Sequence, residues 1–151
     1  MTKLLLSLHV LAAIVAVGPV TVAASMFPPA VRRAGTAPDT LGTVALLHRI
    51  CRVYARLGVL VPVLGLATAA AMGVLGDGWL VTSIALTAAA AGVLAAFVLP
   101  RQEELLDELG AGHTVERAGT AQLAMFTGVF NLLWATVTVL MVIRPGSTTG
   151  A

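Results

Sequence analysis

Residues 4–27 read LLLSLHVLAAIVAVGPVTVAASMF, a stretch without a single Asp, Glu, Lys or Arg. A transmembrane helix needs about 20 consecutive apolar residues, so this segment is long enough to cross a bilayer. Pro28 and Pro29 follow directly. Proline lacks the amide donor and clashes with the preceding turn, which is typical of a helix end. The stretch therefore predicts a membrane-spanning helix over 4–27.

Three further uncharged segments follow, at 57–76, 79–99 and 118–143. Each closes at a turn signal, namely Gly76-Asp77-Gly78, Pro100 and Arg144-Pro145. Residues 41–57 read at helical spacing after Pro38-Asp39-Thr40, so we expect the second helix to run over 41–76 with a cytoplasmic extension. Residues 103–109 predict a short helical extension of the third span over 79–99 or a separate surface helix. Thr114 predicts a cap that starts the fourth helix at 114–143.

The composition allows one class of protein. Hydrophobic residues make up 58% of the chain and charged residues only 11%, whereas a soluble domain carries about a quarter charged residues. Hydrocarbon offers no water to backbone polar groups, so the spans are helices. We expect an all-α, four-transmembrane-helix bundle that forms a single membrane domain over 1–151. It contacts the lipid bilayer, binds no nucleic acid and leaves no room for a separate catalytic domain.

The basic residues orient this bundle. The loop between the first two spans holds Arg32, Arg33, Arg49, Arg52 and Arg56, and the loop between the last two holds Arg101 and Arg117. Lys and Arg favour cytoplasmic loops, so we expect both long loops inside and both termini outside. Lys3 and the small residues 22–25 are also typical of a secretory signal, but cleavage there would move the arginines to the outer face. We expect the first helix to be retained.

His9 is the residue of the spans most able to carry chemistry. It lies five residues inside the first apolar segment, roughly 8 Å below its outer edge. An ionisable side chain at such depth is costly without a partner. Ala12, Ala13 and Ala16 share its helix face, and small side chains admit either a flat ligand or a closely packed helix. A ligand-binding histidine and a hydrogen-bonded structural histidine both remain open.

Two methionines are candidate partners of His9. Counting inward from the helix ends places Met72 and Met141 near its depth. A thioether is one of the axial ligands of haem iron, so His9 with Met72 or Met141 is a candidate haem site. Asn131, in the middle of the fourth span, is expected to hydrogen-bond another helix rather than a substrate.

A second group of candidate ligands lies on the cytoplasmic side. His48 and Cys51 are three residues apart and share a helix face, and His113 lies in the other cytoplasmic loop. Together they would make a three-ligand metal site, although no second cysteine or carboxylate pattern supports it. Interfacial side chains are the alternative interpretation. A hydrocarbon core of about 30 Å separates this group from His9.

Several motifs resemble a known family. They are Lys3 to Gly18 with its Leu-Leu-Leu-Ser-Leu-His9-Val-Leu-Ala-Ala core, Pro100-Arg-Gln before an acidic helix, and Leu140-Met-Val-Ile-Arg-Pro145. Together they resemble the bacterial membrane family named domain of unknown function 2269, over nearly the whole chain. The resemblance implies four transmembrane helices in a bacterial plasma membrane. It implies no particular activity.

The position of His9 is also similar to two more distant families. A histidine near the start of the first helix resembles the haem-ligand position of the bacterial membrane protoporphyrinogen oxidase family and a position in the copper-resistance membrane family. By that likeness His9 would bind haem b. The oxidase family also uses a lysine in a later helix, and residues 79–99 contain none, so whether the chain is an enzyme stays open.

Three hypotheses for the function follow. In the first, His9 binds a b-type haem for electron transfer or redox chemistry. In the second, the bundle is a non-enzymatic accessory or assembly subunit that packs against a membrane protein partner or a second copy of itself. In the third, it transports a small solute or a metal ion.

Overall fold

The computed structural model describes residues 1–147, which fold into long helices and short turns. In chain order these are α1 (Thr2–Ala34), the 3-10 turn η1 (Pro38–Thr40), α2 (Leu41–Leu57), α3 (Leu60–Met72), α4 (Gly78–Val93), the π-helical turn η2 (Leu94–Val98), α5 (Leu99–Gly110) and α6 (Arg117–Ile143). They form four rods, each long and apolar enough to cross a membrane. The expected all-α four-helix bundle is confirmed.

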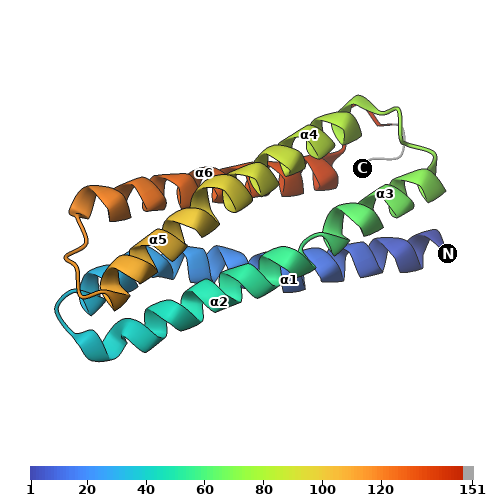
Figure 1. Ribbon diagram of the computed structural model, residues 1–151. Helices are drawn as coiled ribbons and strands as arrows, with labels where there is room; N and C mark the ends of the chain where they lie inside the picture. The colour runs from blue at the N-terminus through green and yellow to red at the C-terminus, as the bar shows by residue number, and fades with distance from the viewer. Residues whose placement is uncertain (148–151) are drawn as a thin grey trace.

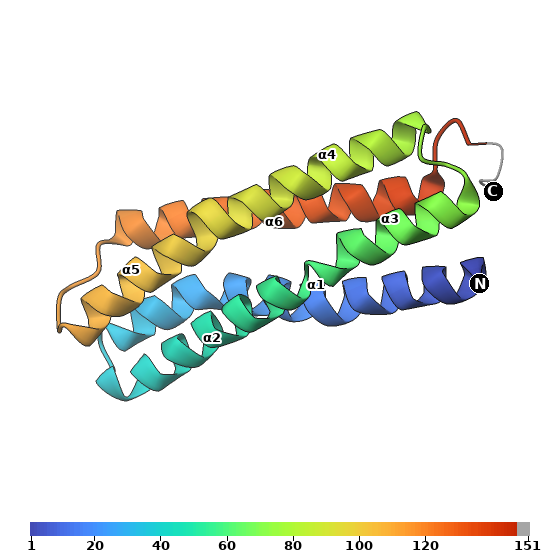
Figure 2. The same ribbon diagram turned by 45° about the vertical axis from the view of Figure 1, so that its right-hand side comes forward.

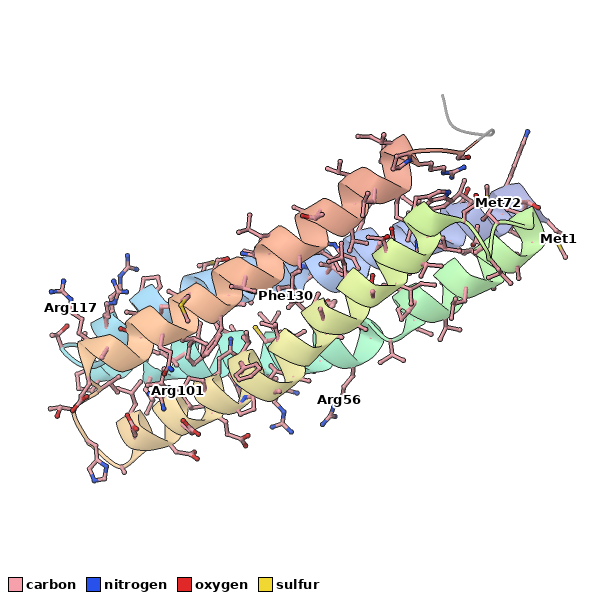
Figure 3. All side chains as sticks on the ribbon, turned by 90° about the horizontal axis from the view of Figure 1, so that it is seen from above. Met1, Arg56, Met72, Arg101, Arg117 and Phe130 are labelled. Carbon is pink, nitrogen blue, oxygen red and sulfur yellow. The ribbon has the colours of Figure 1, made fainter. Side chains whose placement is uncertain are left out.

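The rods run antiparallel along one common axis (Figure 1). Helix α1 packs on α2, α3 and α6, while α4 packs on α6 and α2 packs on α5. Met1 and the end of α6 lie at one end of the bundle, here called the terminal end. The links between α1 and α2 and between α5 and α6 lie at the opposite end, the loop end (Figures 1 and 2). Arg117 lies at this end, whereas Arg56 lies near the middle of the bundle (Figure 3).

Two predicted helix ends at prolines are wrong. Helix α1 continues through Pro28 and Pro29 to Ala34, and the third rod continues through Pro100 to Gly110. Proline is tolerated inside membrane helices because neighbouring groups and local changes of helix pitch accommodate the missing donor. The wider turn η2 lies just before Pro100. The helical extension predicted at 103–109 is therefore part of one long rod.

The second rod differs from its prediction as well. It is interrupted at Gly58–Val59, because Pro62 has no N–H to donate to the carbonyl of Gly58, which accepts from Val61 N at 3.1 Å instead. It ends at Met72 and not at Gly76, since Gly73 adopts a left-handed conformation with φ +72°. Helix α6 begins after Glu116, so the cap predicted at Thr114 lies outside the helix.

Buried side chains concentrate toward the loop end. The buried residues of α1 all lie from Ala16 onwards, and Phe27 and Val31 belong to the larger core cluster, which also contains Val44 of α2 and Leu105 of α5. A smaller cluster of Ala69, Val74, Trp79 and Leu80 joins the ends of α3 and α4. Large apolar side chains are exposed outside the bundle, with Leu132 at 71% and Val142 at 76%. Such a surface suits contact with lipid.

Phe27 offers a test of this core. Its side chain is 0% exposed, whereas the neighbouring Met26 is 51% exposed. We expect Phe27→Ala to lower the free energy of unfolding in detergent by about 3 kcal/mol, because it leaves a cavity in the larger cluster. Met26→Ala should lower it by less than about 1 kcal/mol. Equal losses in the two variants would place Phe27 outside the core.

Candidate functional site

The side chain of His9, on α1, contacts α3. Its Nδ1 atom lies 2.9 Å from the carbonyl oxygen of Val61. A carbonyl only accepts, so Nδ1 carries the proton and donates it to Val61. This bond satisfies one polar atom of the imidazole inside the apolar part of the bundle. The hydrogen-bonded form of His9, one of the two interpretations of the sequence, is therefore present.

Gly65 lies one turn beyond Val61 and makes room for the ring. A Cβ atom built on Gly65 would lie 2.9 Å from Cε1 of His9 and 3.2 Å from its Nδ1. Both approaches are closer than side chains normally come to one another, so only glycine fits at this position without a shift of the imidazole. Val61 and Gly65, spaced by one helical turn, together fix where the ring of His9 lies.

The other ring nitrogen of His9 is left as a free acceptor. With the proton on Nδ1, the Nε2 atom carries a lone pair. No group in residues 1–147 forms a hydrogen bond with it. Histidines that bind metals characteristically donate their second N–H to a carbonyl or carboxylate, which fixes the tautomer and raises the basicity of the ligating nitrogen. His9 has this arrangement on its protein side.

The two candidate methionines lie elsewhere. Met72 follows Gly65 by seven residues, roughly 10 Å further along α3. It packs against the small cluster around Trp79, as does Met141 from α6. Figure 3 shows Met72 near Met1 at the terminal end of the bundle. The structure thus packs His9 against Val61 and Gly65, and Met72 and Met141 against the cluster around Trp79.

Gly65→Ala tests the contact with His9. Alanine in a helix interior is normally favoured over glycine by about 1 kcal/mol, and we expect that gain for Gly92→Ala, where an added Cβ meets nothing within 4 Å. At Gly65 the new methyl group displaces the imidazole, so we expect a loss of about 1–3 kcal/mol. Detergent unfolding measures both variants. A gain at Gly65 equal to that at Gly92 would contradict the close approach.

A second polar group is buried near the loop end, between α2 and α5. His48 is 6% exposed, and its Nδ1 lies 3.1 Å from Oε1 of Gln102. The amide nitrogen of Gln102 donates to Sγ of Cys51 at 3.5 Å. This orientation of the amide leaves Oε1 as acceptor, so His48 donates through Nδ1. The edge of the Phe27 ring completes the surroundings, with ring centroids 6.5 Å apart.

This group does not form the three-ligand metal site that the sequence offered as a candidate. His113 is exposed in the loop before α6 and does not approach His48 or Cys51. In residues 1–147 no three His, Cys, Asp or Glu side chains lie together in a way that could hold a metal ion. His48 and Cys51 are, however, buried rather than interfacial, because α5 covers them with Gln102.

Two partners were missed in the sequence for different reasons. Gln102 directly precedes the acidic residues Glu103 and Glu104, but it shares a helix face with Leu105 and Leu109, and that spacing of i, i+3 and i+7 marks an inward face. Gly65 lay in a stripe of small residues that indicates packing in general. Nothing in that stripe singles out His9 as the group packed against it. The predicted role of Asn131 is confirmed, since its Nδ2 donates to Ser25 Oγ of α1 at 3.2 Å.

Gln102→Leu tests how much the hydrogen bonds of Gln102 to His48 and Cys51 stabilise the protein. The substitution leaves the Nδ1 proton of His48 without an acceptor, and we expect a loss of about 1–3 kcal/mol in the free energy of unfolding. Gln122→Leu, on the exposed surface of α6, should change it by less than about 0.5 kcal/mol. An unchanged stability of the Gln102 variant would mean that His48 finds another partner.

In comparisons with known proteins, no family model, curated protein or solved structure matches this chain. The fold and its polar groups define the chain as a multi-pass α-helical membrane protein with one partly buried histidine at the terminal end. The resemblance to domain of unknown function 2269 stays a prediction.

Proposed function

We propose that this protein binds a b-type haem through Nε2 of His9 and serves one-electron transfer or related redox chemistry in the membrane. The observation that carries the proposal is the 2.9 Å contact between His9 Nδ1 and the Val61 carbonyl. It sets the tautomer that a metal-ligating imidazole needs and leaves Nε2 free.

The residues around His9 fit an axial ligand. The Val61 carbonyl raises the basicity of the imidazole, and Gly65 lets the ring lie against α3 without steric conflict. Haem, when bound, supplies an iron that changes oxidation state by one electron, and its potential depends on its axial ligands and their hydrogen bonds. Because Met72 and Met141 lie in another cluster, we propose His9 as the single protein ligand among the candidates of the sequence.

The membrane setting follows from the charge distribution. The bias of Arg toward the loop end favours a cytoplasmic loop end and termini outside, in a bacterial plasma membrane as the family resemblance implies. His9 then lies toward the outer face. A haem at this depth would exchange electrons with a donor or acceptor in the membrane or at its outer surface.

The visible spectrum of the protein purified in detergent after haem supplementation tests the proposal. We expect a Soret band in the wild-type protein and its loss or shift in His9→Ala, because the ligating nitrogen is removed. His113→Ala is the matched control, since that histidine is exposed at the opposite end of the bundle. Met72→Ala and Met141→Ala should also keep the band. A wild-type protein without a Soret band, or an unchanged band in His9→Ala, rejects haem binding through His9.

A further inference from the structure

A cavity of about 490 Å³ opens at the loop end, far from His9. It lies where the last turn of α1, the turn η1, the end of α5 and the first turn of α6 come together. Apolar walls are formed by Val31, Leu41, Leu109 and Val115. Nothing in the proposed function of His9 uses this cavity.

The charged side chains that line the cavity are basic. Arg32 and Arg117 line the cavity, and no Asp or Glu side chain does. The only ion pair in residues 1–147 joins Arg101 to Glu104, so neither lining arginine is neutralised by a carboxylate. The nearby Glu108 and Glu116 line an adjoining cavity of about 280 Å³, which shares His113 and Thr114 with the first. Two unpaired guanidinium groups beside apolar walls favour an anionic ligand.

The donors of this cavity are partly oriented already. Nε of Arg32 donates to Oγ1 of Thr120 at 3.4 Å, while its two terminal nitrogens have no partner in residues 1–147. Helix α6 begins at Arg117 without a side-chain cap, and the N–H of Gly119 already donates to the carbonyl of Glu116 at 3.1 Å, so in this turn Arg117 is the lining residue whose backbone N–H has no acceptor in residues 1–147. Guanidinium forks and free backbone N–H groups are the donors that proteins use for phosphate.

The depth of the cavity points to the source of the phosphate. The apolar part of α1 ends at Val31, and that of α6 begins at Ala118. The cavity therefore lies where the lipid-facing surface of these two helices gives way to arginines (Figure 3, near Arg117). Lipid phosphates occupy this level of a bilayer, and basic residues there recognise anionic headgroups.

We propose that this cavity binds the phosphate group of a phosphate ester, with Arg32 and Arg117 on the phosphate and the apolar walls against the carbon part of the ligand. An anionic phospholipid headgroup and free phosphate share this chemistry. The site is independent of haem binding by His9.

Titration calorimetry of the full-length protein in a neutral detergent tests the site. The probes are inorganic phosphate, a short-chain phosphatidylglycerol and a short-chain phosphatidylcholine. We expect saturable binding of phosphatidylglycerol that Arg32→Gln combined with Arg117→Gln weakens by roughly tenfold or more, because charge-assisted hydrogen bonds are lost. Arg52→Gln combined with Arg56→Gln is the matched control, since it removes the same charge from the exposed surface of α2.

Each outcome of this experiment either supports or overturns the proposed phosphate site. Saturable binding of inorganic phosphate as tight as that of phosphatidylglycerol supports the site with free phosphate as its ligand, and preference for phosphatidylglycerol over the other two probes supports the headgroup. Absence of saturable binding of every probe overturns the proposal. Equal weakening by the two double variants also overturns it, since the effect would then be one of net charge. If the cavity double variant does not fold, Arg32→Gln and Arg117→Gln alone must each weaken binding more than Arg52→Gln does.

Discussion

Hydrocarbon contains no water, so an unsatisfied donor or acceptor in it costs several kcal/mol. The polar side chains inside this bundle therefore need hydrogen-bond partners within the protein. Hydroxyl groups along the rods solve this locally, by donating to the carbonyl one turn earlier. Such bonds are formed by Ser7, Thr68, Thr82, Ser83, Thr87, Thr136 and Thr138. Longer side chains need partners on another helix, and these partners fix how the helices lie against one another. His9 on Val61, Gln102 on Cys51 and Asn131 on Ser25 are the examples.

The same constraint explains which parts of the fold the sequence predicts. Length and lack of charge suffice for four rods, because nothing but a helix satisfies its own backbone in lipid. The ends of the rods were predicted less well, since the rules for proline come from helices that water can terminate. Pro28 and Pro100 do not end their helices, whereas Pro62 contributes to a real interruption.

The candidate site was predicted in part for a related reason. His9 stands out in the sequence because an imidazole in an apolar span needs a partner. The sequence does not identify Val61 and Gly65 as its partners. The register of two antiparallel helices depends on the side-chain contacts between them, and distance from the helix ends does not predict it. Counting from the ends assumed that all helices start at the same level. Val61 is the hydrogen-bond partner of Nδ1, and Met72 packs against the cluster around Trp79.

The two histidines inside the bundle, His9 and His48, differ in how their surroundings pack. His48 lies in the larger core cluster, with Phe27 against its ring and Gln102 on Nδ1, and its Nε2 is enclosed by protein. A ligand could reach that nitrogen only if the packed core opened. His9 lies on the half of α1 where no residue is buried. Segments with few buried contacts open at low free energy, and binding sites are drawn from them. The protonated nitrogens of both rings are held by one acceptor each, but the core encloses Nε2 of His48, and this difference supports His9 rather than His48 as the proposed ligand.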